Sequence, residues 1–264
     1  SHWIAGNPCD RKSMPSSRKN VWPCTFNFPI SDRRLIPFRA ISSENSMKLN
    51  VSYDFLPKHS GTQAAVVMDH FGIGFETGQH VIANDLELPV EPGDVVCFTG
   101  PSGSGKSSLM RAAAELLTGV LNIDSLELGD KILVDTLPTP VEESMRLLSA
   151  CGLGEAQLML RTPAELSDGQ RYRFRLALGL SRQPQWLLAD EFTATLDRTL
   201  AKVVAFNIRR TSSRSGTGFL LATTHEDILS DLQPSLHVRC GLDGQTEWSR
   251  GEGKKKVSAS PTAC

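Results

Sequence analysis

The sequence of 264 residues predicts an α/β fold of three layers, with helices packed on a largely parallel sheet. Three observations predict it. A glycine-rich loop at residues 100–108 joins a strand-like run to a helix-like run, and two short apolar runs, residues 186–189 and 218–222, each end in polar residues. Such runs are typical of buried parallel strands. Because ligands bind at the carboxyl edge of these sheets, we expect the chemistry where the strands end.

The loop at residues 100–108 predicts a phosphate-binding turn between the strand 94–99 and the helix 108–117. Its glycines let successive backbone N–H groups face one point, and the helix start directs its positive dipole end there. Lys106 is expected to reach the β- and γ-phosphates of ATP, and Ser107 to ligate Mg²⁺. The residues expected to bind the nucleotide here are Gly100, Pro101, Ser102, Gly103, Ser104, Gly105, Lys106, Ser107 and Ser108.

Two carboxylates, Asp190 and Glu191, follow the apolar run 186–189. Asp190 is expected to hold Mg²⁺ through water, and Glu191 to orient or deprotonate the attacking water as a catalytic base. Phosphoryl transfer needs both tasks, because its catalysis is mostly positioning and neutralisation of charge. By itself such a pair is more often a helix N-terminal cap. Together with the phosphate loop it indicates ATP hydrolysis.

Five motifs in a fixed order within residues 66–240 resemble those of the ATP-binding cassette (ABC) ATPase superfamily. The resemblance implies a P-loop NTPase fold of the ABC type, with an antiparallel β subdomain and a reduced helical subdomain. It also implies an ATP-dependent homodimer that sandwiches ATP and Mg²⁺ between its subunits and hydrolyses the nucleotide. Because such a dimer separates after hydrolysis, the nucleotide state becomes a conformational change.

The stretch 165–170, Glu-Leu-Ser-Asp-Gly-Gln, resembles the signature motif of that superfamily. The resemblance implies that Ser167, Gly169 and Gln170 grip the γ-phosphate bound by the opposite subunit. By itself the stretch is an ordinary Ser/Asp cap of the predicted helix 168–182, and the chemistry of a cap is also that of anion binding. Asp168 departs from the commoner glycine, so its charge must either point away from the triphosphate or meet an arginine, with Arg171 and Arg173 as candidates.

Three further residues are assigned by the resemblance. Asp197 falls in a loop implied to cross the dimer interface. His225, after the predicted strand 218–222, is implied to contact the γ-phosphate as a catalytic sensor, although a lone histidine in such a place is usually structural. Phe75 is implied to stack on adenine, with core packing as the alternative.

One departure from the family pattern concerns a glutamine that the superfamily places between the phosphate loop and the signature. After a predicted strand at residues 131–134 the sequence has Asp135 instead, so Asp135 is assigned as a Mg²⁺ ligand in place of the glutamine. The stretch between Lys106 and Ser167 is also short. The pattern is most similar to stand-alone prokaryotic cassettes whose longer members are fused to a predicted acetyltransferase domain, which implies a separate acetyltransferase-like or other protein partner.

Composition agrees with a cytoplasmic protein. The formal net charge of -1 argues against strong nonspecific binding of nucleic acid. No other feature of the sequence indicates a nucleic-acid partner. No apolar run approaches the roughly 18 residues of a membrane span. The six cysteines lack metal-ligand spacing and are interpreted as free thiols.

The expected organisation is a disordered extension over residues 1–46, an ABC-type ATPase domain over 47–240 and a disordered tail over 241–264. Met47 is a possible natural start. The favoured function is an ATPase that is not a transporter subunit. The alternatives are the nucleotide-binding subunit of an ABC transporter, a DNA-linked ABC ATPase, and a regulatory module without turnover, against which Glu191 argues.

Overall fold

The computed structural model describes residues 46–56, 59, 61–75, 77–251 and 257–258, all within one unit of the chain, Ile41–Cys264. The extension predicted over residues 1–46 lies outside the described residues, apart from Ser46. Among the described residues, no helix has both the length and the apolar content that crossing a bilayer requires.

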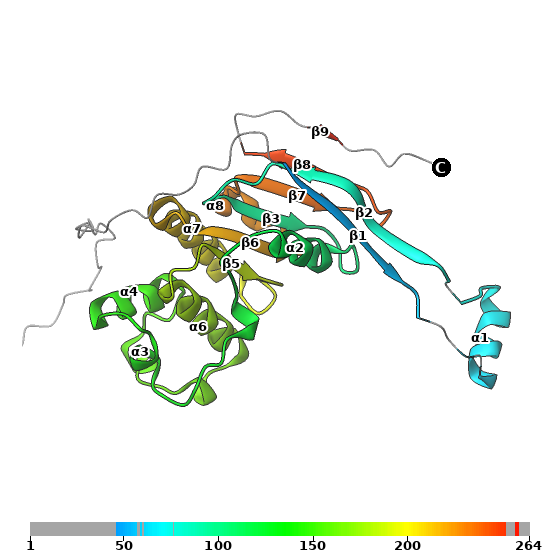
Figure 1. Cartoon of the computed structure of the whole chain (residues 1–264). Coiled ribbons are helices and arrows are strands. Elements are labelled where there is room, and N and C mark those ends of the chain that lie inside the picture. The colour runs from blue at the N-terminus through cyan, green and yellow to red at the C-terminus, as the bar shows by residue number, and fades with distance from the viewer. Residues whose placement is uncertain (1–45, 57–58, 60, 76, 252–256, 259–264) are drawn as a thin grey trace, which may run out of the picture. The chain divides into compact units, whose positions relative to one another are not determined.

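Strands and helices are interspersed along the described residues (Figure 1). The strands are β1 (Met47–Asp54), β2 (Gln79–Leu88), β3 (Val95–Thr99), β4 (Val120–Asn122), β5 (Trp186–Ala189), β6 (Gly218–Thr223), β7 (Leu236–Cys240), β8 (Thr246–Arg250) and β9 (Val257–Ser258). The α-helices are α1 (Thr62–Phe71), α2 (Lys106–Glu115), α3 (Leu133–Thr136), α4 (Val141–Ala150), α5 (Ala156–Met159), α6 (Asp168–Ser181), α7 (Arg198–Ser215) and α8 (Leu229–Leu232). The 3₁₀ turns are η1 (Ile123–Ser125), η2 (Pro163–Glu165) and η3 (Glu226–Ile228).

A seven-stranded sheet, in the order β4-β5-β6-β3-β7-β8-β9, forms the centre of the fold. The strands from β4 to β7 pair in parallel, whereas β8 and β9 are added antiparallel at one edge. The strands β3, β5 and β6 therefore end at the same edge, and the α/β class predicted from the sequence is confirmed.

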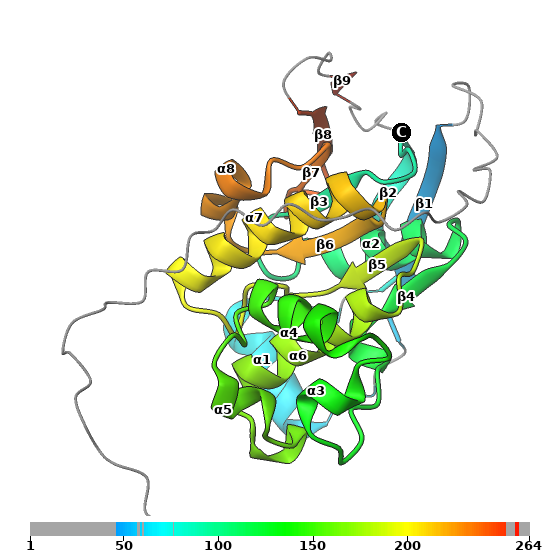
Figure 2. The ribbon, with the colours of Figure 1, turned by 90° about the vertical axis from the view of Figure 1, so that its left-hand side faces the viewer.

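Two hydrophobic cores lie on the two faces of this sheet. Along β3, Val95 and Cys97 belong to one core, and Val96 and Phe98 belong to the other. This follows from the alternation of side chains across a strand. Residues of α6 and α7 pack in the first core and residues of α2 in the second, so helices lie on opposite faces (Figures 1 and 2). The result is the three-layer arrangement that the sequence predicts.

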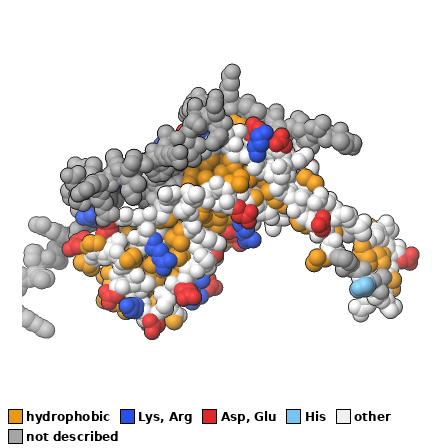
Figure 3. Space-filling model, viewed as in Figure 1, with side chains coloured by type: hydrophobic (Ala, Val, Ile, Leu, Met, Phe, Trp, Pro, Cys, Tyr) orange, Lys and Arg blue, Asp and Glu red, His pale blue; other side chains and the backbone are white. Residues whose placement is uncertain are grey.

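The predicted antiparallel β subdomain is the pair β1–β2, which runs from Met47 opposite Leu88 to Asp54 opposite Gln79. Between its strands lies α1, a helix that the sequence analysis did not predict. None of its residues is buried, and hydrophobic side chains show at its surface (Figure 3). Val66, Val67 and Phe71 are 64, 50 and 70% exposed. Because α1 adds nothing to either core, core patterning gave no signal for it.

The helical segment between β4 and α6 is short, and it corrects one predicted strand. The run 131–134 is not a strand, because α3 begins within it at Leu133. The N–H groups of Asp135 and Thr136 both donate to the carbonyl of Ile132, as in a helical turn. Leu133 is fully buried in the first core. A run with only three apolar residues, 132–134, fits a buried turn as well as a strand, so its pattern could not decide between them.

The end of the sheet corrects the boundary predicted at residue 240. β8 pairs antiparallel with β7 from Thr246 opposite Cys240 to Arg250 opposite Leu236. Trp248 packs against the second core, and Arg250 forms an ion pair with Asp94 at 3.5 Å. The sheet therefore continues beyond residue 240 through β8, and β9 pairs with β8 at its edge.

Gly218 is expected to be indispensable to the packing of β6 on β5. It lies opposite Trp186, and a Cβ at this position would collide with the indole ring. Gly218→Ala should lower the free energy of unfolding by about 1–3 kcal/mol, measured by urea titration followed by circular dichroism.

Gly74→Ala is the matched control, because a Cβ there meets nothing within 4 Å. Combining Gly218→Ala with Trp186→Leu should cost less than the sum of the single changes, since the second removes the colliding ring. Wild-type stability of Gly218→Ala would contradict this packing.

Candidate functional site

The phosphate loop connects β3 to α2, as predicted, and its shape depends on two close approaches. A Cβ at Gly100 would collide with the carbonyl oxygen of Cys240 at the end of β7, and a Cβ at Gly105 would collide with Ile82 of β2. Both glycines have positive φ, 145° and 81°. The loop is therefore shaped by neighbouring strands as well as by its own residues.

Two polar groups of the loop fit a phosphate ligand. Lys106 is 8% exposed, and its Nζ donates to the carbonyl of Pro101 at 2.6 Å, so the ammonium lies across the loop. The Oγ of Ser104 is buried and has no hydrogen-bond partner among the described residues. A buried hydroxyl without a partner costs free energy, which a bound polar group would recover. The loop thus has the charge and the unsatisfied polar atom that an anion requires.

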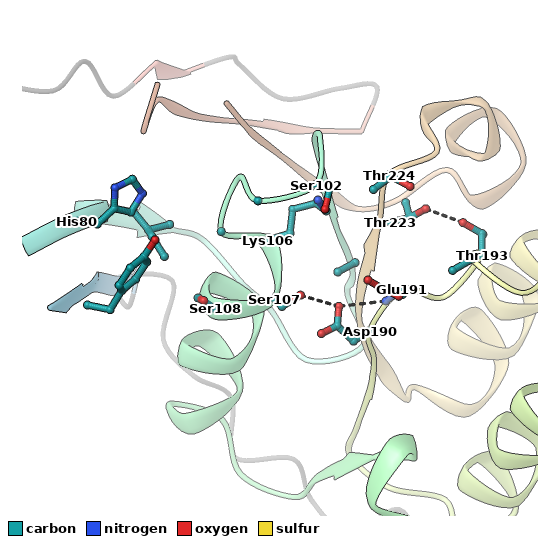
Figure 4. Close-up of a pocket in the computed structure, with 16 residues that line it drawn as sticks. His80, Ser102, Lys106, Ser107, Ser108, Asp190, Glu191, Thr193, Thr223 and Thr224 are labelled. Atoms are coloured by element: carbon teal, nitrogen blue, oxygen red, sulfur yellow. Dashed lines mark hydrogen bonds between the residues drawn. The ribbon is translucent and has the colours of Figure 1, made fainter. Parts of the chain in front are cut away.

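Ser107 and Asp190 meet at the edge of the sheet (Figure 4). The Oγ of Ser107 donates to Oδ1 of Asp190 at 2.9 Å, and Arg111 contacts the other carboxylate oxygen at 3.4 Å. A hydroxyl and a carboxylate are oxygen ligands of the kind that Mg²⁺ prefers, with water and substrate phosphates completing its shell. In the described part of the chain no three His, Cys, Asp or Glu side chains converge on one point. These residues therefore fit a magnesium ion that is held partly by the nucleotide.

Glu191 directly follows Asp190 and has a left-handed backbone, with φ of 46°. That conformation is uncommon for a residue with a side chain. It is held from both sides, because the N–H of Glu191 donates to Oδ1 of Asp190 at 3.0 Å and the N–H of Phe192 donates to the carbonyl of Ala222 at 3.0 Å. Phe192 is fully buried. The exposed Glu191 carboxylate is thus anchored by a core residue.

A cavity of about 370 Å³ lies at this edge, and two of the predicted catalytic residues, Lys106 and Glu191, line it (Figure 4). Its lining residues are Tyr53, His80, Ile82, Ser102, Gly103, Gly105, Lys106, Ser107, Ser108, Asp190, Glu191, Thr193, Ala194, Ala222, Thr223 and Thr224. Loop and carboxylates that lie far apart in the sequence therefore share one cavity.

The aromatic side of the cavity differs from the prediction. Phe75 does not line it and is 36% exposed. Tyr53 and His80 line it instead, with ring centroids 5.0 Å apart, because β1 and β2 pair these two residues directly. Each residue stands near a strand end in the sequence, and only the register of the pair shows that they meet.

The signature stretch caps α6 and does not line the cavity of its own subunit. The side chains of Ser167 and Gln170 each accept a hydrogen bond from the other residue's backbone N–H, at 3.4 and 3.0 Å, in a capping box. Asp168 forms an ion pair with Arg171 at 3.0 Å, which is the first of the two arginines considered. A Cβ at Gly169 would collide with the carbonyl of Thr195.

Asp197 and His225 lie near the same edge of the sheet but do not line the cavity. Asp197 caps α7 by accepting a hydrogen bond from the N–H of Leu200 at 2.9 Å. His225 follows β6, and its N–H donates to Oγ1 of Thr223 at 3.0 Å. Thr224, directly before His225, does line the cavity.

Asp135 is not at the site. It lies on α3 and does not line the cavity. The strand beside β5 is β4, which ends at Asn122, paired with Leu188. The prediction was wrong because it rested on a strand over residues 131–134, where the structure has the start of α3 instead. Asn122 accepts a hydrogen bond from the N–H of Asp124 at 2.9 Å and caps η1.

Comparisons with known proteins agree with this geometry. No family model matches the chain. The chain is 32% identical over 181 residues to the zinc import ATP-binding protein ZnuC of Pseudomonas putida, covering 61% of this chain and 69% of the relative. It is 32% identical over 170 residues to the aliphatic sulfonates import ATP-binding protein SsuB 2 of Mesorhizobium japonicum, covering 57% and 68%.

Solved structures share the fold. The dimeric form of MJ0796, a bacterial ABC transporter cassette, has a TM-score of 0.52 at 18% identity and covers 67% of this chain and 94% of its own. MJ1267, an ATP-binding cassette of an ABC transporter, has a TM-score of 0.52 at 21% identity and covers 65% and 86%. With the phosphate loop, the carboxylate pair and these relatives in place, the chain belongs to the ATP-binding cassette superfamily of ATPases.

Proposed function

We propose that this ATPase is the nucleotide-binding subunit of a transport assembly, closing on ATP with a second copy of itself and passing the movement to a membrane partner. The hydrogen bond between Ser107 and Asp190, beside Glu191 in one cavity, supports the catalytic part. The relatives, named as import ATP-binding proteins, support the transport part. The comparisons do not support the favoured sequence interpretation, an ATPase outside transporters.

The chemistry follows from where the groups lie. The loop N–H groups and the Lys106 ammonium would bind the β- and γ-phosphates and neutralise their charge. Ser107 and Asp190 are the residues that would hold Mg²⁺, which would supply positive charge to offset that of the phosphates. Glu191 would accept a proton from the attacking water, since its carboxylate opens into the same cavity. His225 would reach the γ-phosphate through a small movement of the segment after β6.

The aromatic pair Tyr53 and His80 would receive the base, because both rings line the cavity and lie close enough together to offer it a stacking surface. Ser167, Gly169 and Gln170 would bind the γ-phosphate of the other subunit, since they cap α6 outside their own cavity. An anion at this helix start would meet backbone N–H groups and a favourable dipole. Asp197 would lie at the same interface.

A second candidate function keeps the cassette and changes its partner. The helical segment between β4 and α6 contains only one helix longer than four residues, α4. This small segment supports the proposal that the partner is a separate acetyltransferase-like protein, as the resemblance implies. Either partner would be moved by the same ATP-dependent closure, and both proposals place the chain in the cytoplasm.

Lys106→Ala is expected to weaken ATP binding by about 100-fold, because charge-assisted bonds to the phosphates are lost. Isothermal titration calorimetry measures the affinity, and circular dichroism checks the fold. Lys202→Ala, on an exposed position of α7, is the control for removal of a lysine. Equal affinity in Lys106→Ala and wild type would refute the assignment of the loop.

Glu191→Gln is expected to lower hydrolysis by about 10²–10⁴-fold while ATP still binds, so that a dimer accumulates with ATP. Adding Ser167→Arg puts a bulky cation where the signature would meet the opposite phosphate, and the protein should bind ATP yet stay monomeric. Gel filtration with light scattering gives the mass. Ser213→Arg in the same background controls for the added charge. If the oligomeric state of every variant is the same with and without ATP, the proposal that ATP is bound between two subunits is wrong.

The partner is expected to remain bound when the cycle is stopped. Glu191→Gln protein with ATP, applied to detergent-solubilised membranes and to the soluble fraction of the same cells, should retain an integral membrane protein identified by mass spectrometry. The Glu191→Gln/Ser167→Arg protein is the control, because it should not close. Retention of an acetyltransferase-like protein from the soluble fraction alone would favour the second candidate.

A further inference from the structure

We propose that Asp124 is a further positioning residue of the nucleotide site, whose carboxylate holds water bound to the magnesium ion beside Asp190 and Glu191. This inference rests on the proposed chemistry of the site. It assigns a function to a residue that neither the sequence analysis nor the cavity lining included. It also provides an acidic group at the edge where Asp135 was expected and is not found.

The register of the sheet places Asp124 at the catalytic edge. β4 and β5 are parallel neighbours, with Asn122 opposite Leu188. Asp124 and Asp190 each follow that pair by two residues. Since neighbouring strands lie about 4.8 Å apart, the two strand ends deliver both carboxylates to the same part of the edge.

The backbone around Asp124 is fixed, although its side chain is exposed. Its N–H donates to Oδ1 of Asn122 at 2.9 Å, and the Oγ of Ser125 donates to the carbonyl of Asn122 at 2.8 Å. Ile123, the first residue of η1, is fully buried in the first core. A capped turn on a core anchor holds a side chain in place, which is what a positioning role requires.

The electrostatics place the Asp124 carboxylate in the same field as the catalytic pair. Partial desolvation of the carboxylate, which is exposed on one side only, raises the pKa of Asp124, and the charges of Asp190 and Glu191 raise this pKa further. The guanidinium groups of Arg175 and Arg111 act in the opposite direction and lower it. The carboxylates of Asp190 and Glu191 thus repel that of Asp124, and a divalent cation would relieve this repulsion.

Two residues of α6, Tyr172 and Arg175, lie near the carboxylates of Asp124 and Asp190. The hydroxyl of Tyr172 donates to the carbonyl of Asp190 at 3.4 Å. The Nε of Arg175 is buried without a hydrogen-bond partner among the described residues, so Arg175 is not committed to a bond at that atom. Within the described part of the chain Arg175 forms no contact ion pair with Asp124, and its charge lowers the pKa of Asp124 from a distance.

The contact with the metal would run through water. The described carboxylates do not converge closely enough to enclose an ion by themselves. Mg²⁺ binds through one or two carboxylates and keeps several waters. Asp190, hydrogen-bonded to Ser107, is the direct protein partner, and Asp124 is left to orient the water shell.

The test measures metal affinity with the full-length chain and the β,γ-imido analogue of ATP, which is not hydrolysed. Mn²⁺ replaces Mg²⁺ so that electron paramagnetic resonance reports free and bound metal. Asp124→Asn should weaken Mn²⁺ binding by about tenfold, as loss of an outer-shell partner does. Affinity for the analogue in the presence of EDTA should be unchanged or tighter, because a negative charge near the phosphates is gone.

Asp135→Asn is the matched control, because it makes the same change on α3 away from the cavity. Thermal unfolding without nucleotide or metal is the second readout, and Asp124→Asn should raise the Tm by removing repulsion. Wild-type Mn²⁺ affinity in Asp124→Asn would overturn the inference, as would a lowered Tm with unchanged Mn²⁺ affinity, which would mean that Asp124 only pairs with Arg175. If wild type itself fails to bind the analogue, the proposed function fails instead.

Discussion

The hydrogen bond between Ser107 and Asp190 joins two segments that are 83 positions apart, and the geometry of the site depends on it. It exists because β5 and β3 are parallel and flank β6, so that their carboxyl ends open on one edge. The burial of β3, β5 and β6 on both faces fixes that arrangement. The catalytic edge is therefore a product of core packing, and each functional side chain is placed by the strand that precedes it.

The sequence predicted the parts of the site whose chemistry is local. The phosphate loop, Asp190, Glu191 and the signature cap each consist of adjacent residues, so their spacing along the chain already encodes their geometry. The predictions for Phe75 and Asp135 were of another kind. The role of Phe75 was carried over from the family pattern, and that of Asp135 rested on a strand that the structure does not have. The residues found in their place, Tyr53 and His80 in the cavity and Asn122 beside β5, are brought there by pairing between distant segments.

Tyr53 and His80 meet only through the register of β1 with β2. Asn122 lies at the end of the strand beside β5 only because β4, a strand of three residues, pairs with β5. Strand pairing is a long-range property, and a run as short as Val120–Asn122 carries almost no periodic signal. The insertion of α1 between β1 and β2 adds to the difficulty. The apolar side chains of α1 are exposed and follow no core pattern, so nothing in the sequence indicated that a helix separates β1 from β2.

The closeness of Gly100 to the end of β7 has a consequence for how this loop is constrained over evolution. The carbonyl of Cys240 fills the space that a side chain at position 100 would need. The glycine is thus demanded by a structural strand, independently of any ligand. A descendant of this protein that no longer used ATP would still need glycine at position 100. A glycine at this position in an inactive relative would therefore reflect the packing of the sheet and would not indicate that ATP binding survives.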